Sequence, residues 1–167
     1  QAVLSGWYSC AGSSNGPSSN FYGWLLVSSR TGAGGMIRQD AWNALGQPDH
    51  FVRYAVDGVW TPWEYVNPPM QLGVEYRTVE QYNSKPVYAK AISFGQAPNA
   101  TYKDVSHGIE NFSQLVSYTG MMGGANLIEA SGVDNIQINA SNIRITTNTD
   151  VSANYVYLVL RYTKTTD

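Results

Sequence analysis

The stretch Gln81-Tyr82-Asn83-Ser84-Lys85-Pro86-Val87-Tyr88-Ala89-Lys90-Ala91-Ile92-Ser93-Phe94-Gly95 decides the fold. Asn83 to Lys85 form a cluster of residues typical of turns. Pro86 then opens a run rich in apolar, β-branched and aromatic residues, and Gly95 closes it. Proline is tolerated at the start of a strand, where its missing N–H is least needed. The pattern predicts a strand over residues 87–94.

A stiff joint is expected just before this strand. Asn67-Pro68-Pro69 can neither continue a helix nor donate along a sheet ladder. The chain is therefore expected to consist of a small domain at residues 1–66, a joint at 67–85 and a second domain at 86–167.

The second domain is predicted to be an antiparallel β-sandwich, because short apolar or alternating runs recur through it. Two of them, at 136–139 and 143–147, alternate cleanly and should each present one hydrated face. By contrast, Tyr155 to Leu160 is apolar on both faces, which suits a strand that is central or covered by another subunit. The predicted strands are 87–94, 102–105, 112–118, 127–130, 136–139, 143–147 and 155–162.

The first domain is predicted to contain two hairpins. A Gly-rich connector at 31–35 lies between the runs 25–30 and 36–39, and Asp57-Gly58 joins the runs 51–56 and 59–65.

Three tryptophans of this domain invite an interpretation from the sequence. Trp60 and Trp63, three residues apart, are expected on opposite faces of an edge strand that contains Pro62, unless a bulge intervenes. One indole is then expected in a small core and the other against the neighbouring domain. Residues 41–49 are expected to form a loop that carries Trp42, which could stack on a sugar or pack against a neighbouring subunit.

The composition favours an all-β protein and argues against several functions. Charged residues make up 13%, and there are 16 Gly, 12 Tyr and 5 Trp, as in chains of short strands and tight turns. A net charge of −2, a pI near 5.6 and the lack of a basic cluster argue against nucleic acid. No run is long and apolar enough for membrane insertion. One cysteine and two distant histidines predict no standard zinc site, so neither metal nor cofactor is expected.

Three motifs with possible chemistry are interpreted as structural. Gly12-Ser13-Ser14-Asn15-Gly16 matches the pattern of a nucleophile elbow, but a strand-like run follows it where that motif needs a helix. His107, within Ser106-His107-Gly108-Ile109, is read as a turn residue. The Asp and Glu residues of the second domain lie outside the loops 95–101, 119–126 and 140–142, which are expected to face a ligand. This argues against the pair of catalytic carboxyl groups that a glycosidase needs.

Two groups of residues resemble known families. Tyr76-Arg77-Thr78-Val79-Glu80-Gln81-Tyr82-Asn83 with Lys85-Pro86-Val87-Tyr88, then Ser106-His107-Gly108-Ile109, resembles the head at the end of tailed-bacteriophage fibres. Gly6-Trp7-Tyr8, Gly23-Trp24-Leu25-Leu26-Val27, Gln39, Arg53-Tyr54 and the hairpin from Asp57 to Trp63 resemble the knob domain of R-type pyocin fibres. This likeness covers most of residues 1–66.

The resemblance implies a homotrimeric tail fibre in a virion, whose distal tip binds a bacterial surface receptor. A saccharide such as lipopolysaccharide or wall polysaccharide is the expected partner, bound without chemical change. One alternative is a tailspike-like enzyme that cleaves or deacetylates polysaccharide. Another is the fibre of a contractile-tail bacteriocin.

The binding site is expected in loops at the far end of the second domain. If successive strands run antiparallel, loops 95–101, 119–126 and 140–142 share one end, and loops 106–111, 131–135 and 148–154 share the other. Amide side chains supply donors and acceptors at little cost in charge, and an aromatic ring offers apolar contact to a sugar. The candidate binding residues are Gln96, Asn99, Tyr102, Met122, Asn126, Asn142 and Trp42.

Overall fold

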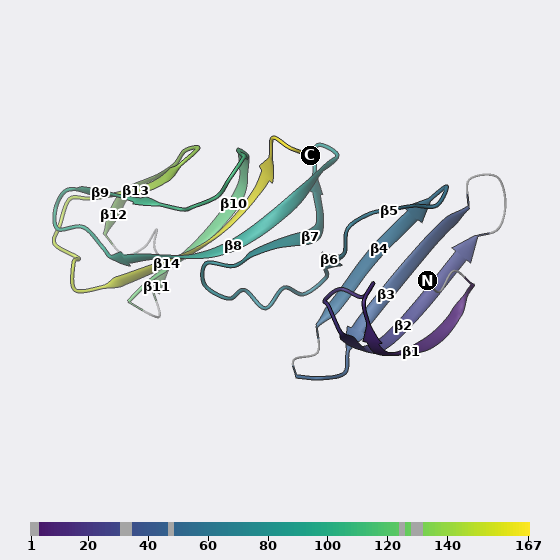
Figure 1. The fold of residues 1–167 in the computed structure, drawn as a ribbon. Coiled ribbons are helices and arrows are strands. Elements are labelled where there is room, and N and C mark those ends of the chain that lie inside the picture. The colour runs from purple at the N-terminus through teal and green to yellow at the C-terminus, as the bar shows by residue number, and fades with distance from the viewer. Residues whose placement is uncertain (1–3, 31–34, 47–48, 124–125, 128–131) are drawn as a thin grey trace. The chain divides into compact units, whose positions relative to one another are not determined.

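The protein is all-β. The computed structural model describes residues 4–30, 35–46, 49–123, 126–127 and 132–167 (Figure 1). In these ranges the chain forms strands and no helix, so no helix there could cross a membrane. The strands are β1 (Gly6–Ser13), β2 (Phe21–Arg30), β3 (Met36–Asn43), β4 (His50–Val56), β5 (Val59–Trp60), β6 (Glu64–Tyr65), β7 (Glu75–Tyr82), β8 (Lys85–Gln96), β9 (Tyr102–Ser106), β10 (Phe112–Met122), β11 (Asn126–Leu127), β12 (Val133–Ile138), β13 (Asn142–Thr147) and β14 (Tyr155–Lys164).

The chain divides into two compact units. Unit 1 comprises residues 1–69 with 77–79, and unit 2 comprises residues 70–76 with 80–167. Within the stretch that was expected to be a joint, residues 75–82 form β7. Asn83 and Ser84 follow with positive φ of 50° and 61°, and β8 starts at Lys85. Positive φ at both central residues matches a two-residue hairpin turn.

Unit 1 is built on the antiparallel order β1-β2-β3-β4, with β5 and β6 both paired to β4. The Asp57-Gly58 hairpin was predicted, and both residues have positive φ, 51° and 80°. The connector between β2 and β3 falls largely on residues 31–34, outside the described ranges. One sheet face carries a core of Phe21, Leu25, Val27, Ala41 and Phe51.

The interpretation of the unit 1 tryptophans was wrong on two points. Trp42 lies in β3, opposite Trp24 of β2, and not in a loop. Trp60 and Trp63 both contact the guanidinium of Arg53, because β5 ends at Trp60 and the chain through Pro62 is no longer a strand. Strict alternation therefore does not apply across those residues.

Unit 2 consists of two sheets that face one another. One has the order β7-β8-β14-β10-β11, and the other has the order β12-β13-β9. The six predicted strands that lie wholly in described residues all occur, most of them extended by a few residues, although β12 ends at Ile138, one residue before the predicted end. The seventh starts as β11 at Asn126. Residues 128–130 of that seventh strand lie outside the description.

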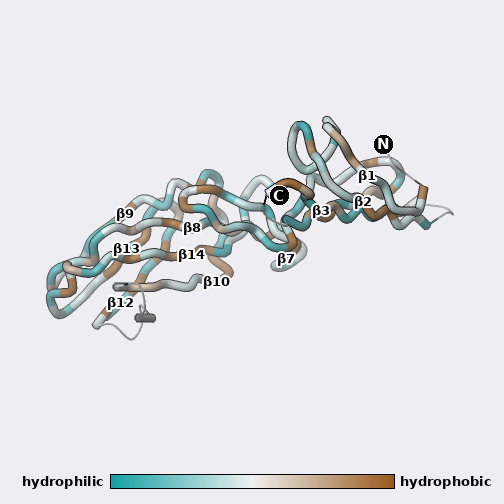
Figure 2. Tube along the Cα trace, turned by 90° about the horizontal axis from the view of Figure 1, so that it is seen from below, coloured by the Kyte–Doolittle hydropathy of each residue, from teal (hydrophilic) through white to brown (hydrophobic). Residues whose placement is uncertain are grey.

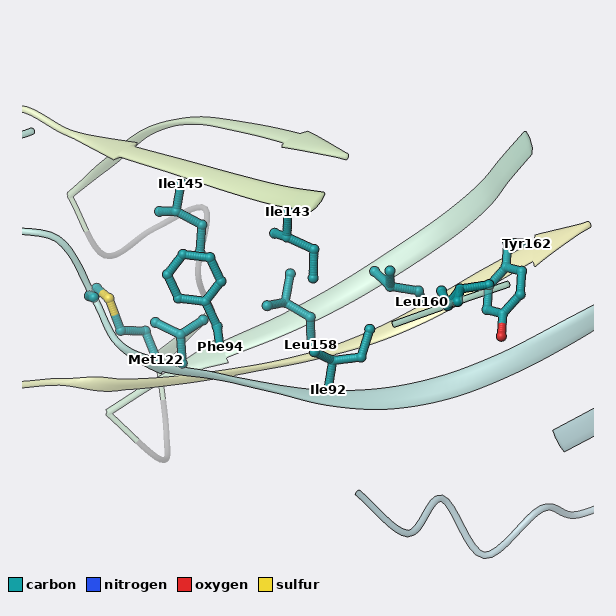
Figure 3. Close-up of a cluster of buried hydrophobic side chains, with 11 residues drawn as sticks. Ile92, Phe94, Met122, Ile143, Ile145, Leu158, Leu160 and Tyr162 are labelled. Atoms are coloured by element: carbon teal, nitrogen blue, oxygen red, sulfur yellow. The ribbon is translucent and has the colours of Figure 1, made fainter. Parts of the chain in front are cut away.

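The core of unit 2 holds its two sheets together. Ile143 and Ile145 point from β13 toward Phe94, Ile92 and Leu158 of the other sheet (Figure 3). Figure 2 shows hydrophobic and hydrophilic residues alternating along β13, so that the opposite face of this strand is polar. β14 buries Val156, Leu158 and Leu160 and leaves Tyr155 and Tyr157 exposed.

The loops of unit 2 are not grouped as predicted. Ala100 N–H donates to Thr149 O, and Gly123 N–H donates to Tyr155 O, so residues 97–101 and Gly123 lie at the same end as loop 148–154. His107 N–H donates to Ser141 O, which places loops 107–111 and 139–141 at the other end. The prediction assumed that each strand runs opposite to the one before it. It failed because β11 and β12 run in the same direction. β11 is antiparallel to β10, and the pairings of β12 with β13 and of β13 with β9 give β12 the direction of β9.

Truncating the contact between the sheets should destabilise unit 2. Ile145→Ala is expected to lower the free energy of unfolding by about 2–5 kcal/mol, since the side chain is fully buried. Urea denaturation followed by circular dichroism measures the change. Thr146→Ala, the next residue on the opposite face, is the control and should cost less than about 1 kcal/mol. Equal costs for the two variants would contradict this account of the core.

Candidate functional site

The outer face of the three-stranded sheet is a continuous surface of mostly polar side chains. Side chains alternate across the sheet, and Val105, Ile136, Ile138, Ile143 and Ile145 occupy the core side. The opposite side, here called the polar face, is formed by Tyr102, Asp104, Ser106, Asn135, Gln137, Asn142, Arg144 and Thr146.

Tyr102, Asp104 and Arg144 form the centre of the polar face. Arg144 donates from Nε to Asp104 Oδ1 at 2.8 Å and from Nη2 to Oδ2 at 2.7 Å. Its Cζ lies 4.5 Å from the centroid of the Tyr102 ring, a cation–π distance. The Tyr102 side chain is nevertheless 58% exposed.

The ion pair leaves this region without net charge. The hydrogen bond from Arg144 lowers the pKa of Asp104, and the hydrogen bond to Asp104 raises the pKa of Arg144. Both groups therefore stay ionised and paired at neutral pH. The Tyr102 ring is thus held beside the ion pair. The hydroxyl and amide side chains of the polar face around it can both donate and accept hydrogen bonds.

Two of the predicted site residues share this face. Tyr102 lies opposite Thr146, and Asn142 lies opposite Ser106. Ser106 is four positions after Tyr102, so Tyr102 and Asn142 are roughly 13 Å apart along the strand direction.

The other candidates of unit 2 lie elsewhere. Gln96 and Asn99 are exposed at the end of unit 2 that holds loop 148–154. There the backbone of Asn99 forms an isolated antiparallel β-bridge with that of Asp150. The prediction of Met122 as a binding residue was wrong, because Met122 is only 2% exposed and belongs to the core of unit 2. The backbone of Asn126 pairs with Met122, and its side chain lies outside the description.

Trp42 belongs to an aromatic group on unit 1. Its ring stacks on His50, with centroids 4.7 Å apart, and on Trp7, with centroids 5.5 Å apart. His50 Nε2 lies 3.2 Å from Asp40 Oδ1, and Asp40 accepts two hydrogen bonds from Arg38. These rings lie on the sheet face opposite to the unit 1 core.

The geometry of His107 supports its interpretation as a structural residue. Its Nδ1 accepts a hydrogen bond from Ile109 N–H at 3.1 Å, and its Nε2 lies 3.1 Å from Asn139 O. Because a carbonyl only accepts, Nε2 carries the proton and the ring is neutral. The ring thus connects two loops at one end of the sandwich, with both nitrogens engaged.

The nucleophile-elbow match also lies in an unsuitable setting. Residues 14–20 connect β1 to β2, two neighbouring antiparallel strands, so Ser14 is exposed in a hairpin loop. The motif requires the sharp turn from a strand to a helix.

Five carboxylates of the described residues pair with an arginine or a lysine. In these parts of the chain no group of three or more His, Cys, Asp or Glu residues could hold a metal ion. The carboxylate–cation pairs are Asp40–Arg38, Glu64–Arg77, Glu75–Lys164, Glu80–Arg161 and Asp104–Arg144.

Comparisons with known proteins give structural neighbours. No family model and no curated protein matches the chain. An N-truncated R2-type pyocin tail fibre aligns with a TM-score of 0.36 and 10% identity over 95% of this chain and 91% of its own. The C-terminal part of the P. aeruginosa R2 pyocin fibre gives 0.34 and 11% over 95% and 62%, and that of the R1 fibre gives 0.31 and 13% over 95% and 63%.

These neighbours are R-type pyocin tail fibres, which is the class of protein that the sequence motifs resemble. The chain spans less than two thirds of the second and third of these structures.

The neutral state of His107 should make folding sensitive to pH. Burial lowers the pKa of His107, and the nearby Lys90 lowers it further, against the opposing effect of the bond to Asn139 O. The unfolded chain takes up this proton near pH 6.5 and the folded chain only at lower pH, so the free energy of unfolding should fall between those values as pH decreases.

Urea midpoints at pH 7 and pH 5 measure this effect. His107→Gln should show a smaller decrease between the two pH values than the wild type, whereas His50→Gln, the matched control, should keep the decrease attributed to His107. An unchanged pH dependence in His107→Gln would contradict the assignment.

Proposed function

We propose that this chain is the receptor-binding part of a bacteriophage tail fibre, or of a related contractile-tail bacteriocin, and that it binds a bacterial surface saccharide. The observation that carries the proposal is the polar face, with the exposed Tyr102 ring held beside the Arg144–Asp104 pair. Sugar rings combine apolar faces with hydroxyl groups, and such a surface complements both. The motifs that resemble fibre heads and pyocin knobs supply the biological setting, at the distal tip of the fibre in a virion.

Binding is proposed to leave the saccharide intact. Hydrolysis would need two carboxyl groups about 5–9.5 Å apart across the bond to be cut, one of them protonated. On the polar face Asp104 is held ionised by Arg144. It can accept hydrogen bonds there but is poorly suited to act as an acid.

Replacing the exposed ring should weaken the binding of host polysaccharide. Tyr102→Ala is expected to reduce affinity about ten-fold or more, which corresponds to the loss of about 1.4 kcal/mol or more at an aromatic contact. Retention on purified surface polysaccharide from candidate host strains measures it. Tyr22→Ala, an exposed tyrosine of unit 1, is the control.

The same incubation tests the enzymatic alternative. Intact polysaccharide recovered after binding supports a binder, whereas fragments or released acetate would show a tailspike-like enzyme. If Tyr102→Ala and Tyr22→Ala bind as the wild type does, the polar face is not the receptor site.

A homotrimer is part of the proposal. The outer face of β14 carries the exposed Tyr155 and Tyr157, and Met121 of β10 lies opposite Tyr157. Exposed apolar groups that adjoin in this way are typical of surfaces that another subunit covers. Three linked copies of a weak site can gain about 10²-fold to 10⁴-fold in avidity on a cell surface.

Light scattering of the purified protein tests this assembly. The wild type is expected to have the mass of three chains, and Tyr157→Lys should lower that mass by placing a charge in the apolar contact. Tyr102→Ala should leave the mass unchanged. A wild-type protein with the mass of a single chain would contradict the trimer.

A further inference from the structure

Unit 1 contains a buried positive charge. Arg53 lies in β4 on the face that carries the unit 1 core, and only 9% of its surface is exposed. Its Nε donates to Gln39 Oε1 at 2.8 Å, and Gln39 is itself only 1% exposed. A neutral amide thus orients the guanidinium without balancing its charge.

The surroundings of Arg53 are aromatic. Its Cζ lies 4.3 Å from the ring centroid of Trp60 and 4.3 Å from that of Trp63. Burial lowers the pKa of Arg53, as expected for a cation without a countercharge. Within the described ranges no ion pair joins Arg53 to an acid, and the neighbouring Asp40 points to the other sheet face, where Arg38 binds it.

A buried charge without a partner is costly, and folded proteins usually pair it. Indole rings contribute cation–π attraction but cannot neutralise the charge. The guanidinium still has its Nη donors for a planar anion, which it can bind with two parallel hydrogen bonds. These observations point to a bound anion.

Arg53 lines a cleft of about 440 Å³, a size suited to a small ligand. Its lining includes Gln39, Tyr8 and Trp63, the end of β1 at residues 12–13 and the start of the following loop at residues 14–17. Trp63 Nε1–H donates to Asn15 O at 3.4 Å, which ties that loop to the cleft. Gly16 packs so tightly on Phe21 that a Cβ on residue 16 would lie 2.3 Å from the Phe21 Cβ. This close contact fixes the position of the loop against the unit 1 core.

We propose that this cleft binds the carboxylate of an acidic sugar, with Arg53 as the anion-binding residue. Among the described residues that line the cleft Arg53 is the single charged group, which matches a monoanion better than the dianion of phosphate. The rings of Tyr8 and Trp63 and the serine hydroxyls of the loop suit the remainder of a sugar. The site belongs to unit 1 alone and is independent of the polar face of unit 2.

Titration of the full chain with glucuronate, glucose and inorganic phosphate tests the proposal, with tryptophan fluorescence as the readout because Trp60 and Trp63 contact Arg53. Glucuronate should bind at least ten-fold more tightly than glucose and more tightly than phosphate. Arg53→Gln should abolish the response. Arg38→Gln, an arginine on the opposite sheet face, should keep it, as should Tyr102→Ala on the polar face.

A second variant tests the site independently, in case Arg53→Gln does not fold. Ser14→Trp, at an exposed position of the cleft wall, should block the site and leave the circular dichroism spectrum unchanged. Equal binding of glucose and glucuronate, no saturable response, or a response that survives Ser14→Trp would each overturn the proposal. Tighter binding of phosphate than of glucuronate would overturn the assignment to an acidic sugar.

Discussion

The packing of Ile143 and Ile145 against Phe94 and Leu158 is the contact on which the architecture of unit 2 depends. It presses the three-stranded sheet onto the sheet that contains β8 and β14. Because side chains alternate along a strand, seating the isoleucines in the core also directs Arg144 outward. A shift of register by one residue would bury Arg144 and expose the isoleucines, so the same constraint fixes both the core and the polar face.

Unit 1 shows the same alternation with a different outcome. In β4 the alternation that seats Phe51 in the core also places Arg53 on the inner face, so a cation occupies a position where an apolar residue would cost less. Gln39 and two indoles hold the guanidinium in place. A stable fold does not require such a charge, and its burial without a paired acid among the described residues is the reason for assigning a ligand to the cleft.

The sequence located the strands better than it located the site. Counting strands to decide which loops share an end assumes that every connection reverses the chain, and the connection from β11 to β12 does not. Asn142 therefore came out at the opposite end of the sandwich from Gln96 and Asn99. Asp104 and Arg144 were missed because binding residues were sought in loops, although the alternation through Ile143 and Ile145 already indicated a hydrated face.

The sequence by itself determined the all-β class, the Asp57-Gly58 hairpin and most strands of unit 2, because turn residues and alternation act over a few neighbouring positions. Only the tertiary structure decided that Met122 is buried, that Trp60 and Trp63 meet on Arg53, and that Tyr102 and Asn142 share a face. Each of these depends on strand order and register, which are set by contacts between residues far apart in the chain. For the same reason the buried charge of Arg53 could not be recognised from its position in an apolar run.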